Sequence, residues 1–181
     1  MTAQPASTNL AGPVAEARKR MLKLVSIALP AIAALALVPA AHAADVQRNY
    51  AAPTALFASN ITVPAGSDLV FLSGAAVPPP KDAPANGATE AQGDAVLKLI
   101  VDNLKSQGLG PGDVVSMHVY LVGDPAKGGV MDFAGWNAAY KKVFGTADQP
   151  NRPTRTTVQV SALAGPGSLV EVEVVAARTK H

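Results

Sequence analysis

Residues 170–176 read Val-Glu-Val-Glu-Val-Val-Ala, with a small apolar side chain at every second position. Side chains alternate between the two faces of a β-strand, so this stretch predicts a strand with one apolar face. Residues 113–122 alternate in the same way, and valines and an alanine at every second position of 158–162 predict a third such strand. The carboxyl-terminal half of the chain is therefore expected to build a β-sheet with one face directed to a core.

The segments that connect these strands have helical spacing. Residues 89–107 begin with the Thr-x-x-Gln spacing of a capping box, continue with apolar residues three and four positions apart, and stop before Gly108. Residues 133–145 carry aromatic and aliphatic side chains at the same intervals and predict a second helix, the main anchor of the core. Upstream, residues 61–63 and 69–72 predict two short strands. The predicted order is β-β-α-β-α-β-β.

Two helices cannot cover both faces of a sheet of five or more strands. We therefore predict an α+β fold with a mixed sheet and both helices on one face. On the assumption that the valines face the helices, the opposite face is predicted to carry Arg155, Thr157, Gln159, Ser161, Leu169, Glu171, Glu173 and Val175. Such a mixed surface either lies in water or is buried against another subunit.

The first 43 residues have the pattern of a secretory signal peptide. A basic cluster at 18–23 precedes an uncharged apolar stretch at 24–38, and small residues end at Ala43. The apolar stretch is shorter than the roughly 20 residues that a membrane-spanning helix needs. We expect cleavage after Ala43, no membrane contact afterwards, and a periplasmic or secreted protein; the alternative is an uncleaved anchor. Met21 could start the same signal, which would place residues 1–20 upstream of the true start.

Removing this leader changes the charge of the protein. It carries four of the 15 Lys and Arg and one of the 13 Asp and Glu, so the remaining 138 residues have 11 basic and 12 acidic side chains. A net charge of −1 does not favour nucleic acid as a partner. We expect a flexible lead-in at 44–53 and one domain at 54–181.

The residue types present exclude several kinds of chemistry. The chain has no cysteine, which rules out disulfides, thiolate catalysis and cysteine-ligated metal. His118 is the only histidine between the predicted cleavage site and the terminal residue His181, so no zinc-like ligand cluster is expected. A guanidinium and a carboxylate on one sheet face, Arg155 and Glu171, are a candidate site for a small carboxylate-bearing molecule. The alternative is an ordinary solvated strand face.

Five motifs together resemble the Rid (YjgF) family. They are Arg152-Pro153-Thr154-Arg155-Thr156-Thr157 with the valines that follow, residues 170–176, Leu72-Ser73-Gly74, residues 107–115, and Phe133-x-x-x-Asn137-x-x-Tyr140. They occur in the family's order over roughly residues 54–178. The chain has Ala75 where many members have glutamine, Phe57 where deaminases use tyrosine, and Thr156-Thr157 in place of Ser-Cys.

The resemblance implies a chorismate-mutase-like fold and a homotrimer with sites between subunits. In members that hydrolyse 2-imino or enamine acids to 2-oxo acids and ammonia, the arginine matching Arg155 holds the substrate carboxylate, and the glutamate matching Glu171 positions the attacking water. Ser73, Asn137 and Phe57 match further substrate-binding positions. Orientation of an electrophilic imine and one water can suffice without metal or cofactor. The alternatives are a non-catalytic protein that binds small carboxylates and, less favoured, an endoribonuclease.

Overall fold

The computed structural model describes residues 45–78 and 88–180. The predicted leader, most of the predicted proline-rich loop at 77–87 and His181 lie outside these residues. The described elements are β1 (Gln47–Asn49), β2 (Asn60–Thr62), β3 (Asp68–Ala76), α2 (Ala88–Ser106), β4 (Val114–Val122), α3 (Phe133–Lys141), β5 (Thr154–Val160) and β6 (Val170–Arg178), with short 3-10 turns at Pro111–Asp113 and Pro125–Lys127.

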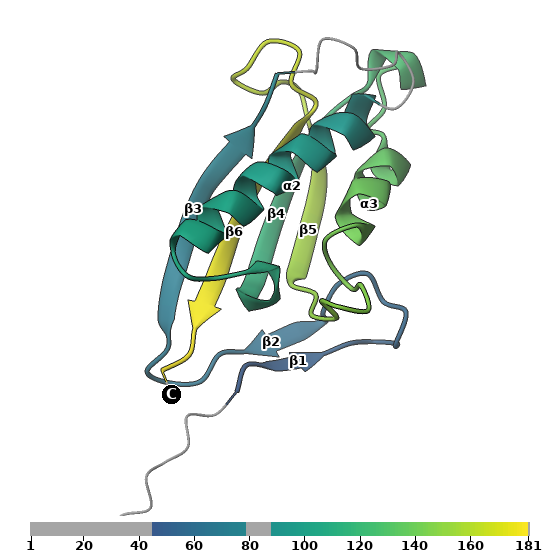
Figure 1. Ribbon diagram of the computed structural model, residues 1–181. Coiled ribbons are helices and arrows are strands. Elements are labelled where there is room, and N and C mark those ends of the chain that lie inside the picture. Colours follow the sequence, from purple (N-terminus) through teal and green to yellow (C-terminus); the bar gives the residue numbers. More distant parts are fainter. Residues whose placement is uncertain (1–44, 79–87, 181) are drawn as a thin grey trace, which may run out of the picture. The chain divides into compact units, whose positions relative to one another are not determined.

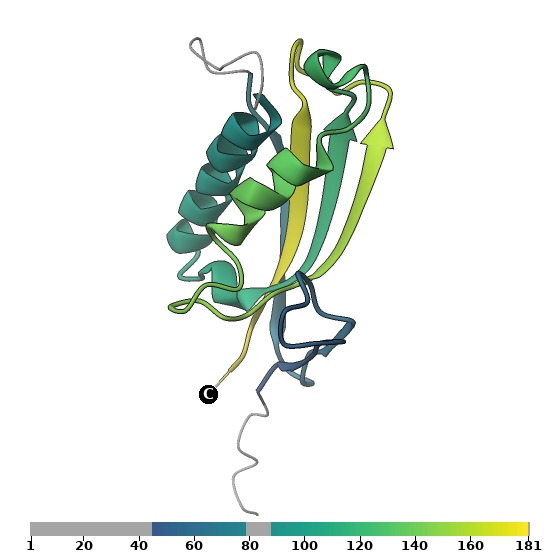
Figure 2. The same ribbon diagram turned by 90° about the vertical axis from the view of Figure 1, so that its right-hand side faces the viewer.

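A four-stranded mixed sheet forms the centre of the fold. Its strand order is β3-β6-β4-β5, with β4 and β5 parallel and the other pairs antiparallel. Figures 1 and 2 show α2 and α3 together on one face of this sheet. This arrangement confirms the predicted α+β class. The prediction of five or more strands in one sheet is wrong, because β2 pairs with β1 in a separate two-stranded sheet.

The core lies between the sheet and the two helices. Trp136 and Tyr140 of α3 are fully buried, and the Tyr140 ring stacks on Phe144 with 4.9 Å between ring centroids. Gly93 of α2 permits close helix packing, because a Cβ at that position would stand 2.9 Å from the Cβ of Ala139. Within the described ranges, neither helix is long and apolar enough to span a membrane. Trp136 and Tyr140 anchor the core as predicted, whereas Phe133 of the same helix is 41% exposed, so its predicted place in the core is wrong.

Gln92 of α2 does not complete the predicted capping box. Its side-chain NH₂ donates to the carbonyl of Gly167 over 3.1 Å, and its amide oxygen accepts from the Leu169 N–H over 2.7 Å. The side chain is buried and satisfies the backbone just before β6. The Thr-x-x-Gln spacing therefore marks the start of the helix, while the glutamine serves a tertiary contact that local spacing cannot predict.

Residues 47–49 also differ from the sequence-based expectation of a flexible lead-in at 44–53. They form β1, which pairs with β2 in the register Gln47–Thr62 to Asn49–Asn60. Arg48 also fixes the strand, through hydrogen bonds to the carbonyls of Gly112 and Val114. These partners lie more than 60 residues away in the chain, so no periodicity within 44–53 could have predicted them.

Candidate functional site

Arg155 is the second residue of β5 and lies on the face of the sheet that the helices cover. Its register partner in β4 is Met117, a fully buried core residue. One terminal nitrogen of the guanidinium, Nη2, donates to Asn137 Oδ1 of α3 over 2.9 Å. Burial lowers the pKa of Arg155 below its ordinary value. The structure therefore brings together two of the predicted site residues, Arg155 and Asn137.

Three aromatic rings surround this guanidinium. The Arg155 Cζ atom lies 4.5 Å from the ring centroid of Tyr140, 5.4 Å from that of Phe57 and 5.8 Å from that of Phe133. Tyr140 and Phe133 belong to α3, whereas Phe57 comes from the loop between β2 and β1. The π-faces of these rings attract the cation. Phe57 thus lies beside Arg155, the residue that Asn137 also contacts.

Polar groups around Arg155 lack partners. Arg155 Nη1, the Thr157 hydroxyl and the Tyr140 hydroxyl are buried and make no hydrogen bond. Among the described residues, no carboxylate pairs with Arg155. A buried guanidinium with an unpartnered N–H group costs free energy of folding unless an anion accepts a hydrogen bond from it. The planar guanidinium group of arginine fits a carboxylate. We call Arg155, Asn137, Phe57, Phe133 and Tyr140 the arginine half-site.

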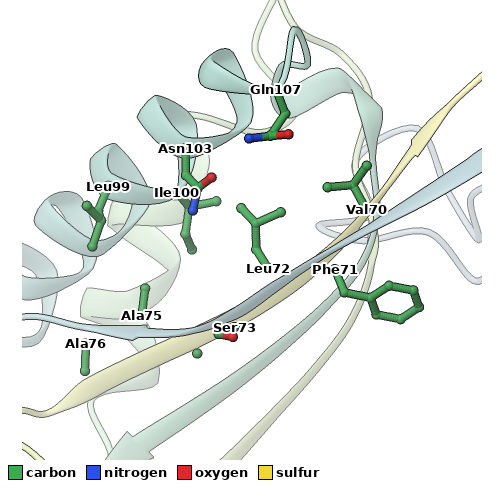
Figure 3. Close-up of a pocket in the computed structure, with 11 residues that line it drawn as sticks. Val70, Phe71, Leu72, Ser73, Ala75, Ala76, Leu99, Ile100, Asn103 and Gln107 are labelled. Carbon is green, nitrogen blue, oxygen red and sulfur yellow. The ribbon is translucent and has the colours of Figure 1, made fainter.

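Glu171 and Ser73 lie in a second cluster. Strand β3 has a bulge between Leu72 and Ala75, and the two residues of this bulge are Ser73 and Gly74. Gly74 adjoins the Glu171 side chain so closely that a Cβ there would overlap Glu171 Oε1. Both bulge residues also line a groove of about 610 Å³ between β3 and α2 (Figure 3). Ser73, Gly74 and Glu171 are the glutamate half-site.

A hydrogen-bonded group extends this second cluster across the sheet. Glu173 Oε1 lies 2.9 Å from His118 Nδ1 and accepts from the Tyr120 hydroxyl over 3.2 Å. Glu173 and His118 line a cavity of about 330 Å³ together with Phe71 and Ser73. In Figure 3, Phe71 points away from α2, whereas Leu72 points toward it. The glutamate half-site therefore continues onto the sheet face opposite the helices.

The two half-sites do not meet within one chain, which corrects the prediction that Arg155 and Glu171 share a sheet face. Arg155 pairs in register with core-facing Met117, whereas Glu171 pairs with Tyr120 on the other face. Alternation shows which residues of one strand share a face, but the register between strands decides which faces match. The expectation for β5 was reversed: Val158 is 41% exposed, and Arg155 points toward α3.

Sequence reasoning placed Phe133 and Tyr140 in the core and overlooked their contact with Arg155. A signal was present, because both share a helix face with Asn137 at spacings of four and three. The unpartnered Thr157 hydroxyl gave no sequence signal beyond its position two residues after Arg155. Among residues 45–78 and 88–180, no three or more histidine, cysteine or acidic side chains gather as a metal site would require.

Comparison with known proteins shows the family of the chain. The family model described as endoribonuclease L-PSP matches residues 50–178. The conserved Rid-family protein YyfB of Yersinia pestis is 20% identical, with 67% of this chain and 86% of that chain covered and a TM-score of 0.52, which shows a common fold.

Two further solved structures are similar. A YjgF-family protein of Neisseria meningitidis is 23% identical, with 77% of this chain and 100% of that chain covered and a TM-score of 0.48. TdcF of E. coli, solved with bound serine, is 29% identical, with 63% and 83% covered and a TM-score of 0.48. The match of the family model over most of the chain decides the assignment. The chain belongs to the endoribonuclease L-PSP family, the Rid (YjgF) family that its sequence motifs indicate.

Proposed function

We propose that this protein binds a small carboxylate-bearing metabolite at Arg155 and hydrolyses 2-imino or enamine acids to 2-oxo acids and ammonia. The observation that carries the proposal is the buried guanidinium of Arg155, with Nη1 unpartnered and no carboxylate beside it among the described residues. A substrate carboxylate would accept from Nη1, while Asn137 holds Nη2 in place. The aromatic rings around Arg155 would shield the pair from water and strengthen it.

A second copy of the chain would complete the site. Strand β3, which carries Ser73 and Gly74, and strand β5, which carries Arg155, are the two edges of the sheet, and Glu171 lies on β6 next to β3. Two different surfaces that join one copy to the next make a heterologous contact, which closes into a ring when the rotation permits. The family implies a ring of three. In such a trimer, Glu171 of one subunit would reach the ligand that Arg155 of its neighbour holds.

The proposed reaction needs orientation and one proton-transfer group. Arg155 fixes the carboxylate, so that C2 of the imine faces the glutamate half-site of the neighbouring subunit. Glu171 accepts a proton from water as the water oxygen bonds to C2, and the imine nitrogen takes up the electron pair of the C=N bond. Glu171 returns its proton to that nitrogen, which gives a carbinolamine with a hydroxyl and an amino group on C2. The hydroxyl proton then passes to the amino nitrogen as the C=O bond forms and the C–N bond breaks, which releases ammonia and leaves the 2-oxo acid. Ser73 can donate to the substrate from the same side as Glu171.

The test is ammonia release from freshly generated 2-iminopropanoate and 2-iminobutanoate. We expect the rate above the spontaneous reaction to rise linearly with protein concentration and to saturate with substrate. Spontaneous hydrolysis in matched protein-free samples sets the baseline. A well-folded protein that leaves both rates at this baseline would contradict the proposal.

A non-catalytic carboxylate-binding protein is the second candidate. The observation that favours it is the separation of Glu171 from Arg155, because binding needs only the arginine half-site of one chain. This alternative predicts saturable binding of pyruvate, measured by calorimetry, with no ammonia release from either imine. The endoribonuclease activity in the family description is less favoured, because the chain after Ala43 is slightly acidic. RNA cleavage that survives loss of Arg155 would indicate a contaminating nuclease.

Gly74→Ala is expected to impair the chemical step more than substrate binding. The added methyl group would overlap Glu171 Oε1 and displace the carboxylate, whereas Arg155 lies on the other face of the sheet. We expect kcat to fall about tenfold, with KM changed less than about twofold. Steady-state ammonia release measures both values. Gly110→Ala, which adds the same methyl group in open space, is the matched control. Equal values for both variants would argue against a role of Glu171 in turnover.

A further inference from the structure

The segment before Arg155 is joined to the amino-terminal strand by an arginine outside the family match. Arg48 Nη1 donates to the carbonyl of Val114 over 2.9 Å, and its Nη2 donates to that of Gly112 over 2.8 Å. The same Nη1 atom lies 3.4 Å from the carbonyl oxygen of Arg152. The family model begins at residue 50, so β1 and Arg48 lie before the matched region.

Arg152 holds the loop that follows β1. Its backbone N–H donates to the Tyr50 hydroxyl over 3.0 Å, and its Cζ lies 4.1 Å from the centroid of the Tyr50 ring. Its Nη1 atom donates to the carbonyls of Pro53 and Ala55. Arg152 therefore contacts the loop at Tyr50, Pro53 and Ala55, while Arg48 lies against the carbonyl of Arg152.

The loop has a further anchor, and Phe57 lies between the anchors. The Ala58 N–H donates to the carbonyl of Pro153 over 2.9 Å, two residues before Arg155. Phe57 thus stands between Ala55, held by Arg152, and Ala58, held by Pro153. Its ring centroid is 5.4 Å from Arg155 Cζ, although the ring itself is 43% exposed. Figure 1 shows β1 and β2 at the end of the main sheet where β5 begins.

We infer that Arg48 and Arg152 are positioning residues, which lock the loop between β1 and β2 so that Phe57 covers the guanidinium of Arg155. A half-exposed phenylalanine on a loop would otherwise have several rotamers and backbone positions available. The lock reduces this freedom before a ligand arrives, and preorganisation of this kind raises affinity. The expected effect on ligand binding rests on the proposed function of Arg155. The positioning of Phe57 over Arg155 does not depend on that function.

Labelling with phenylglyoxal, a reagent for exposed guanidinium groups, tests the cover without any ligand. In Arg48→Gln, we expect the rate of Arg155 modification, followed by peptide mass spectrometry, to rise about tenfold because Phe57 moves away. Arg178→Gln is the matched control, since Arg178 also donates to a backbone carbonyl, that of Gln107, but lies away from the loop. Phe57→Ala removes the cover without the lock and should raise the rate as Arg48→Gln does. An unchanged Arg155 rate in both Arg48→Gln and Phe57→Ala would overturn the inference.

Kinetics then separate this inference from the proposed function. With 2-iminobutanoate, we expect Arg48→Gln to raise KM about tenfold and to leave kcat within about twofold, a split that general destabilisation would not produce. Faster labelling of Arg155 in a protein whose wild type does not hydrolyse the imine would support the lock and refute the enzymatic function. The contrary result would be unchanged labelling of Arg155 in Arg48→Gln, with kcat lowered only as far as the amount of folded protein falls. Arg48 would then stabilise the fold without positioning Phe57.

Discussion

Arg155→Ala is expected to lower kcat/KM for 2-iminobutanoate by about 100-fold or more. The substitution removes the charge-assisted hydrogen bond from Nη1 to the substrate carboxylate, worth up to about 3 kcal/mol, and leaves that carboxylate without its cation. Every 1.36 kcal/mol corresponds to a factor of about ten in rate. The fold should persist, because the buried charge does not stabilise it. Burial disfavours the charged guanidinium and so lowers the pKa of Arg155, and no carboxylate among the described residues offsets this cost. Steady-state ammonia release together with a thermal melt measures both effects.

Arg155→Lys provides the graded comparison for this prediction. A lysine keeps the positive charge but lacks the planar fork that can bind Asn137 and a carboxylate at once. We expect its kcat/KM to lie between those of the wild type and Arg155→Ala. If Arg155→Ala retained wild-type kinetics while melting normally, Arg155 would not be the carboxylate-binding residue.

The elements were largely predictable from the sequence because their patterns are local. Residues 170–176 alternate with period two, and β6 contains them with Val172, Val174 and Ala176 buried. The aromatic residues of 133–145 have helical spacing, and α3 buries Trp136 and Tyr140. Such patterns reflect the geometry of one element and need no knowledge of its neighbours.

Some residues of the candidate site were predictable, but its geometry was not. The motifs selected Arg155, Asn137 and Phe57, which the structure brings together. They also selected Glu171, which the register of β4 with β5 and β6 places on the other sheet face. Register is a property of strand pairs, so no pattern within β5 or β6 reports it.

Edge position explains why the valines of β5 misled the prediction. An inner strand such as β6 has neighbours on both sides, and its apolar face packs under the helices. Strand β5 has one neighbour, and its helix-facing side carries Arg155 and Thr157, while Val158 is exposed on the other side. Apolar residues on an exposed edge face suit contact with another copy of the chain. The valines of β5, which the sequence-based prediction placed against the helices, are therefore consistent with a contact between subunits in the proposed assembly.

Mixing two inactive variants is expected to restore activity. In a head-to-tail ring, each site takes Arg155 from one subunit and Glu171 from the next, so an Arg155→Ala chain and a Glu171→Gln chain can together form an intact site. When equal amounts assemble at random, about one quarter of the sites combine the two intact half-sites. We therefore expect roughly one quarter of the wild-type kcat per site after the two variants are refolded together or produced in one cell, and almost none from either alone.

The double variant Arg155→Ala/Glu171→Gln, mixed in equal amounts with wild-type chain, gives the opposite comparison. If each site used both residues of one chain, about half of the sites would be active; if sites form between chains, about one quarter would be. The two mixtures thus separate the alternatives: sites between chains predict about one quarter in both, whereas sites within chains predict almost none in the first and about half in the second. The opposite sheet faces of Arg155 and Glu171 favour sites between chains, because no rotamer change moves a side chain through a hydrogen-bonded sheet.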